Sequence, residues 1–133
     1  MILVDTSIWI ELLNGKLGKT LEPDELFRFV TCGPVLQEVF QGLREGAPRD
    51  GAPSESLKEA MLAIPRVSDP MPLEAYLEGA EIYRRGRKKG FTIRSSTDCL
   101  IAAVAIRNRV PVWHKDRDFD LIAKYTGLET RGG

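Results

Sequence analysis

Short runs of mostly apolar residues, separated by helical segments, constrain the fold of this chain more than any other feature of its sequence. Residues 2–4, 29–32 and 110–113 form such runs. Strands that are apolar without alternation are buried on both faces, as in parallel sheets covered by helices. Residues 66–68 are expected to add a brief edge strand. The sequence therefore predicts an α/β protein in three layers, α/β/α, with a mostly parallel central sheet.

The segments between these runs have apolar residues at helical spacing and suitable capping residues. Asn14 and Gly15 are expected to end the first helix, and residues 45–56, rich in Gly and Pro, to form a loop. The longest helix is expected to turn Leu77, Ala80, Ile82 and Tyr83 toward the core. The expected helices span 8–13, 23–27, 34–45, 54–64, 73–89, 97–106 and 119–125.

Four carboxylates stand where a predicted strand ends or a predicted helix begins. Asp5 follows the first strand, Asp116 follows the strand at 110–113, and Glu38 and Asp98 lie in early helical turns. Sites in such sheets form at the carboxyl ends of the strands. Clustered carboxylates raise one another's pKa unless a cation compensates, and Mg²⁺ or Mn²⁺ prefers oxygen ligands. The pattern predicts a divalent metal centre suited to phosphate chemistry.

Each of these acids also has a simpler interpretation. Asp5 and Asp98 can be helix N-caps, and Glu38 can be a solvated helix residue. Asp116, Asp118 and Asp120 can be loop and first-turn acids at a helix start. The coincidence of four acids at strand ends favours the metal centre over these separate roles.

The other chemically capable residues support less specific predictions. His114 follows a strand, a position more typical of a structural histidine, and Cys32 and Cys99 are expected to be buried free thiols. Arg94 precedes Asp98 by four residues and is a candidate contact for substrate phosphate. The same role is open to a basic cluster at the end of the longest helix, although such clusters are usually solvated. This basic cluster comprises Arg84, Arg85, Arg87, Lys88 and Lys89.

Length and charge set broad limits. The 133 residues predict one domain, 1–133, large enough for its own core. Nineteen basic and nineteen acidic residues give zero net charge, so overall charge does not decide for or against a nucleic-acid partner. The apolar N-terminus is too short for a signal peptide, and no apolar run is long enough to span a bilayer. The expected location is the cytoplasm.

Four segments in order along the chain each contain one of the acids. They are residues 1–11 (MILVDTSIWIE), 35–43 (VLQEVFQGL), 97–103 (TDCLIAA) and 115–119 (KDRDF). This ordered set resembles PIN-domain proteins, particularly the VapC toxins of toxin–antitoxin pairs, over nearly the whole chain. The resemblance implies a PIN-like α/β/α domain and an endoribonuclease that uses Mg²⁺ or Mn²⁺.

The resemblance also implies roles for particular residues and partners. Asp118 can share or take the role of the fourth acid, and Ser7 supports the metal. His114 departs from the Thr or Ser that relatives often carry two residues before the fourth acid. A homodimer and a VapB-like antitoxin are implied as partners, beside the RNA substrate. The acids that the resemblance makes catalytic and metal-binding are Asp5, Glu38, Asp98 and Asp116.

Two other functions fit parts of the same sequence. A non-catalytic RNA- or protein-binding module would keep the acids as helix caps, and would show no specific Mn²⁺ site. An aspartyl-phosphate phosphatase would use Asp5 as its nucleophile. Such enzymes typically have a second Asp two residues later, where this chain has Ser7.

Overall fold

The computed structural model describes residues 1–13, 23–45 and 54–132 and contains a parallel four-stranded sheet. The strand order is β2-β1-β3-β4, and every neighbouring pair runs parallel. The strands are β1 (Ile2–Val4), β2 (Phe29–Val30), β3 (Val112–His114) and β4 (Thr130–Gly132). This parallel sheet confirms the predicted α/β fold class.

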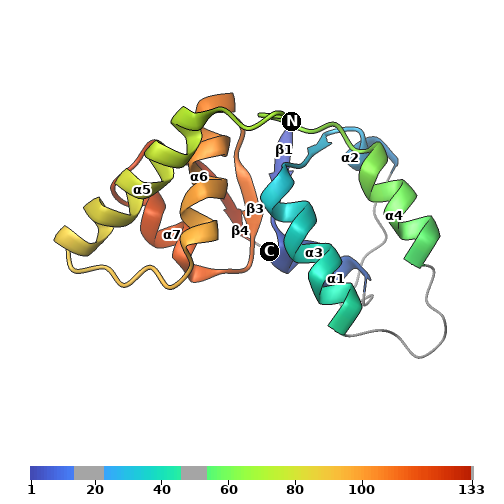
Figure 1. Cartoon of the computed structure of the whole chain (residues 1–133), viewed down its shortest axis with the longest axis horizontal. Coiled ribbons are helices and arrows are strands. Elements are labelled where there is room, and N and C mark those ends of the chain that lie inside the picture. The colour runs from blue at the N-terminus through green and yellow to red at the C-terminus, as the bar shows by residue number, and fades with distance from the viewer. Residues whose placement is uncertain (14–22, 46–53, 133) are drawn as a thin grey trace.

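Helices cover both faces of this sheet, which gives the predicted three layers (Figure 1). α6 and α7 lie on one face, and α5 packs against α6; α1 and α3 lie on the other face, with α4 beside α3. Among the described helices, none has the length and apolar character needed to cross a membrane. The helices are α1 (Thr6–Leu13), α2 (Pro23–Leu26), α3 (Gly33–Glu45), α4 (Ser54–Ala63), α5 (Leu73–Lys88), α6 (Ser96–Asn108) and α7 (Arg117–Ala123).

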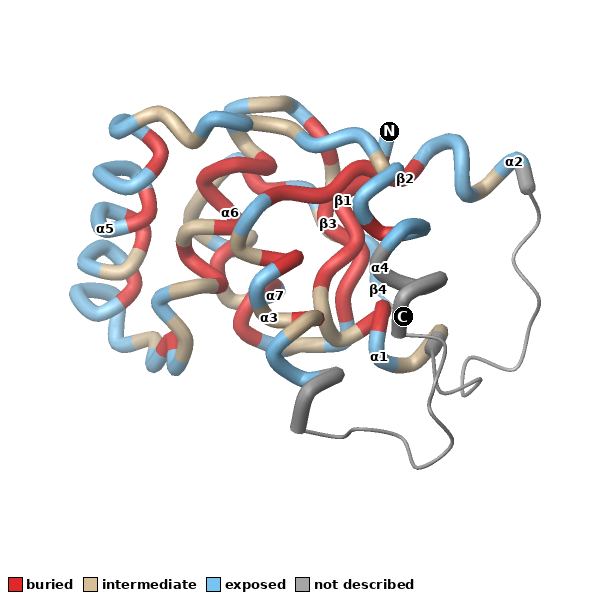
Figure 2. The backbone as a smooth tube through the Cα atoms, turned by 45° about the vertical axis from the view of Figure 1, so that its right-hand side comes forward, coloured by how far each residue is buried: buried red, intermediate tan, exposed pale blue. Residues whose placement is uncertain are grey.

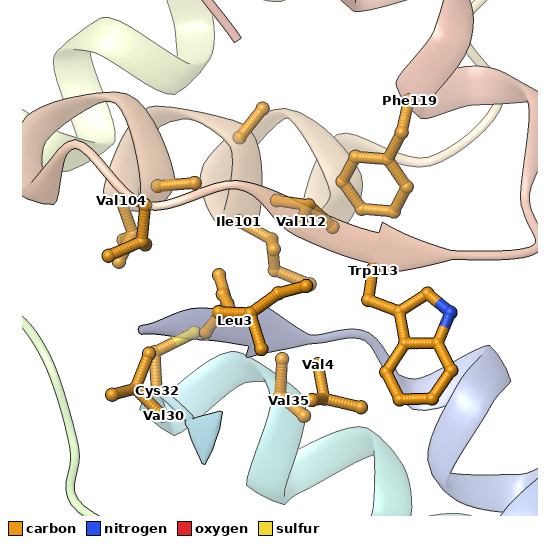
Figure 3. Close-up of a cluster of buried hydrophobic side chains, with 14 of the residues drawn as sticks. Leu3, Val4, Val30, Cys32, Val35, Ile101, Val104, Val112, Trp113 and Phe119 are labelled. Atoms are coloured by element: carbon orange, nitrogen blue, oxygen red, sulfur yellow. The ribbon is translucent and has the colours of Figure 1, made fainter. Parts of the chain in front are cut away.

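The core lies where β1, β3 and α6 meet, because these elements contain most of the completely buried apolar residues of the sheet and its helices. Leu3 pairs with both Val30 and Val112 and is completely buried. Figure 3 shows Ile101 of α6 and Val35 of α3 packed around these strands from opposite layers. The tube in Figure 2 is correspondingly buried along the central strands and much of α6. This continuous core fixes the strand ends on which the acidic residues stand.

The two cysteines are buried free thiols, as the sequence predicted. Cys32 and Cys99 both lie within the hydrophobic core. Burial raises the pKa of each thiol to about 11, so both stay protonated at neutral pH.

The structure confirms Ile82 on the buried face of α5 and packs Tyr83 against the core, and it corrects the prediction for Leu77 and Ala80 of that helix. Its buried residues are Ala75, Gly79, Ile82 and Gly86, whereas Leu77 is 61% exposed and Ala80 is also exposed. Gly79 faces α6 where the two helices approach closely, and Gly86 faces Tyr125 and Ile93. A Cβ atom at Gly79 would lie only 3.2 Å from the Cα atom of Leu100.

The strand boundaries also differ from the predictions. The expected strand at 66–68 is reduced to one isolated bridge between Arg66 and Thr31. β4 was not predicted, because its sequence Thr-Arg-Gly lacks an apolar run and the strand is held by backbone pairing with β3. The expected stop at residues 14–15 and most of the expected loop at 45–56 lie outside the described residues.

Candidate metal centre

Parallel strand pairing brings the first and last of the predicted acids to one edge of the sheet. Asp5 directly follows β1, and Asp116 lies two residues beyond the end of β3. The amide N–H of Asp5 donates to the carbonyl oxygen of Trp113 at 3.0 Å, which continues the pairing past the end of β1. The carboxyl ends of β1 and β3 therefore present both acids on the same side.

The other two predicted acids reach this edge from helices on opposite faces of the sheet. Glu38 lies in α3, and Asp98 lies in the first turn of α6, whose N-cap is Ser95. Asp5, Glu38 and Asp98 each have a carboxylate oxygen within 4.8 Å of the others. Asp98 also belongs to a second group with Asp116 and Asp118, under the same limit. The structure thus brings together all four predicted acids and Asp118, with Asp98 common to both groups.

Hydroxyl groups at the start of α1 hold the first group in place. The Ser7 hydroxyl donates to Oδ2 of Asp5 at 2.6 Å and accepts the amide N–H of Lys115 at 3.1 Å. Thr6 donates from Oγ1 to Oε1 of Glu38 at 3.0 Å. Ser7 was predicted as a supporting residue, whereas Thr6 was not. The only sequence signal for Thr6 is a hydroxyl immediately after the first acid.

The second group is held by two backbone amides that are far apart in the sequence. Oδ1 of Asp116 accepts the amide N–H of Asp118 at 3.0 Å and caps α7. Oδ2 of Asp118 accepts the amide N–H of Arg94 at 3.0 Å. Asp118 therefore ties α7 to the segment that leads into α6 and Asp98. Arg94 contributes its main chain to this network, and its side chain is exposed.

The basic cluster at the end of α5 makes contacts of its own. Arg84 pairs with Glu81 one turn earlier, and Arg85 donates to the carbonyl oxygen of Tyr125 at 2.6 Å. The guanidinium of Arg87 lies over the ring of Tyr83. In Figure 1 this end of α5 lies away from the ends of β1 and β3. Of the predicted phosphate contacts, Arg94 is therefore the better placed.

Burial and mutual repulsion raise the pKa values of the central acids. Burial is the larger cause for Asp98, whose pKa rises from 3.8 to about 9, and the carboxyl of Asp116 adds to the shift. Burial also raises the pKa of Asp5 and of Glu38, against the lowering effect of Ser7 and Thr6 respectively. Without a cation, the cluster therefore disfavours its fully ionised form.

Several carboxylate oxygens in the cluster are buried without a hydrogen-bond partner. They are Oδ1 of Asp5, Oδ2 of Asp98 and Oδ1 of Asp118. A buried carboxylate oxygen without a partner is energetically costly. A hard divalent cation bound by oxygen ligands would satisfy these atoms, so the residues present fit Mg²⁺ or Mn²⁺.

Helix capping accounts for only part of this arrangement. Asp5 and Asp116 each accept a backbone N–H in the manner of a cap, through one oxygen. Asp98 does not cap α6, because Ser95 has that role and accepts the amide N–H of Asp98. A set of independent caps would therefore leave Asp98, the most perturbed acid, unexplained.

Fold and site together define a class: a parallel α/β/α protein with an acidic cluster at the carboxyl edge of its sheet. The PIN domain family model matches residues 2–125. The chain belongs to the PIN domain family, which confirms the resemblance seen in the sequence.

Individual relatives agree with this assignment. The chain is 36% identical to Ribonuclease VapC11 of Mycobacterium tuberculosis and to VapC ribonuclease Mb1587 of Mycobacterium bovis, over 97% of this chain and 96% of each relative. Its fold is similar to a crystal structure of VapBC2 from Rickettsia felis bound to a promoter DNA fragment. That match has a TM-score of 0.73 at 17% identity and covers 100% of this chain and 99% of the other.

Proposed function

We propose that this protein is a Mg²⁺- or Mn²⁺-dependent endoribonuclease and the toxin of a toxin–antitoxin pair. The observation that carries the proposal is the cluster of partnerless buried carboxylate oxygens in a chain whose relatives are named VapC ribonucleases. The proposed metal ligands and catalytic residues are Asp5, Glu38, Asp98 and Asp116. Asp118 contributes to the same centre while it holds the segment before α6.

The bound metal would supply a water of lowered pKa and would stabilise negative charge on the phosphate. The residues of the chain do the positioning. Ser7 and Thr6 orient the carboxylates of Asp5 and Glu38 through their hydroxyl groups. The exposed Arg94, whose amide binds Asp118, is proposed to contact a phosphate of the RNA.

A groove beside the cluster is the proposed path for the RNA strand. It has a volume of about 840 Å³, and Thr6 and Glu38 of the site line it together with Gln37, Gln41 and Tyr76. Amide and aromatic side chains are groups that bind unpaired bases by hydrogen bonding and stacking. The groove thus joins surfaces for bases to the acids that would hold the metal.

The remaining parts of the proposal concern partners and context. The VapBC names of the structural neighbours support a VapB-like antitoxin as partner of this chain. A homodimer, a single PIN domain over residues 1–133 and a cytoplasmic location complete the proposed assignment. Size measurement of the purified chain, alone and with its antitoxin, tests the assembly.

An RNA cleavage assay with the purified chain tests the activity. We expect cleavage with Mg²⁺ or Mn²⁺, none with a chelator, and loss of cleavage in Asp5→Asn and Asp98→Asn. Glu129→Gln, a change at an exposed acid outside the cluster, is the matched control and should retain activity. Metal-independent cleavage, or full activity in both Asn variants, would show that the acidic cluster is not the active centre. If the activity is confirmed, sequencing of RNA ends after expression of the protein identifies the RNA target.

A further inference from the structure

His114 is a buried polar residue that the proposed metal site does not use directly. It is the last residue of β3 and is 2% exposed. Its Nδ1 atom accepts the amide N–H of Asp116 at 3.1 Å, and its ring packs against Phe119. Nε2 lies 3.3 Å from Oδ1 of Asp120, close but not aligned as a hydrogen bond. The imidazole therefore joins the end of β3 to the residue that carries the fourth acid.

The contact at Nδ1 determines which nitrogen of the neutral ring carries the proton. An Nδ1 atom that accepts an N–H has a free lone pair, so the neutral ring carries its proton on Nε2, on the side of Asp120. The preceding amide, that of Lys115, is held by the Ser7 hydroxyl. Two successive amides of the turn between β3 and α7 are thus bound by side chains. Together they set the backbone direction from which the Asp116 carboxylate projects.

We propose that His114 is a positioning residue for Asp116, through this acceptor at Nδ1. The inference rests on the proposed function, in which Asp116 is a metal ligand. The polar partners of metal ligands typically change metal affinity or activity about 10–100-fold when they are replaced. The competing role is packing alone, in which the ring only fills space beside Phe119.

Two variants separate the hydrogen bond from the packing. His114→Asn places an amide oxygen at the position of Nδ1 and so keeps an acceptor for the Asp116 N–H. His114→Gln places its amide group near the position of Nε2 and so removes that acceptor. Both remove the ring and its contact with Phe119. Ile122→Val, which removes one buried methyl from α7, controls for general loss of stability.

Mn²⁺ affinity, measured by calorimetry, is the first readout. We expect His114→Asn and Ile122→Val to stay within about threefold of wild type, and His114→Gln to bind at least about tenfold more weakly. The second readout needs no metal: the Asp116 amide should exchange slowly with solvent in wild type and His114→Asn, and faster in His114→Gln. The ¹⁵N shifts of His114 should show an unprotonated Nδ1.

Equal Mn²⁺ affinities for His114→Asn and His114→Gln, or equal exchange of the Asp116 amide in both, would overturn the positioning role. Failure of the wild-type protein to bind Mn²⁺ would instead overturn the proposed function. The amide exchange and the imidazole shifts, measured without metal, would still decide the role of His114 in holding the turn.

Discussion

Asp98 should make the metal-free protein less stable as the pH rises. Its pKa is raised from 3.8 to about 9, chiefly by burial, so the unfolded chain loses this proton at a lower pH than the folded protein does. Between these two values the unfolded state binds fewer protons, and the free energy of unfolding falls with increasing pH. This loss of stability is absent below the pKa of Asp98 in the unfolded chain and complete above its pKa in the folded protein.

The magnitude follows from the width of this window. One carboxyl that stays protonated only in the folded state costs about 1.4 kcal/mol per pH unit, so about 4 kcal/mol accumulates between about pH 5 and about pH 8. Such a loss is a large fraction of the stability of an ordinary domain. Asn at position 98 has nearly the same shape without the ionisable group, and removes this dependence.

Urea unfolding in the presence of a chelator measures the effect. The advantage of Asp98→Asn over wild type should grow by about 4 kcal/mol from about pH 5 to about pH 8. Glu129→Gln, at an exposed acid, should follow the wild type at every pH. The reasoning is refuted if Asp98→Asn and wild type lose stability in parallel, or if the wild type becomes more stable toward pH 8.

Further predictions follow from the same geometry. Mn²⁺ should raise the Tm more at about pH 8 than at about pH 6, because fewer protons remain to be displaced from the acids; thermal scans showing the opposite trend would contradict this. Asp116→Asn should weaken Mn²⁺ binding in calorimetry more than Asp118→Asn, because the charge of Asp116 acts on the pKa of Asp5, Glu38 and Asp98, whereas that of Asp118 acts on none of these three. Gly79→Ala should lower the free energy of unfolding by about 1–3 kcal/mol, since its Cβ atom would meet the backbone of Leu100. Gly42→Ala should raise the free energy of unfolding by up to about 1 kcal/mol, because a Cβ atom at Gly42 would have no neighbouring atom within 4 Å. Urea midpoints that shift in the same direction for both would be inconsistent with this packing.

The sequence predicted the parts of the fold that depend on local hydrophobicity. Continuous apolar runs located β1 and β3, and the rule that parallel strands end at one edge placed Asp5 beside Asp116. The fold was not predictable where backbone geometry replaces side-chain pattern. β4 is polar and is held by its ladder with β3, and α5 buries Gly79 against the backbone of α6 and Gly86 against Tyr125, where larger side chains would not fit.

The candidate site also combines features that the local sequence reveals with features that only the folded chain reveals. Its acids follow strand and helix ends, which a sequence reveals, whereas the bonds that hold the acids join residues far apart in the chain. Thr6 reaches Glu38 across 32 positions, and Ser7 reaches the amide of Lys115 across 108. Such pairs depend on the folded register rather than on any local spacing.

The use of main-chain amides to hold the acids has a consequence for how this protein can diversify. Asp118 binds the amide of Arg94 and Ser7 binds the amide of Lys115, and both of these basic residues are exposed. An amide is present whatever non-proline side chain the residue carries. Mutations can therefore exchange the side chains at positions 94 and 115 for other non-proline residues without removing either amide from the acidic cluster. Under the proposed function, contacts with RNA can in this way change while the acids keep their positions.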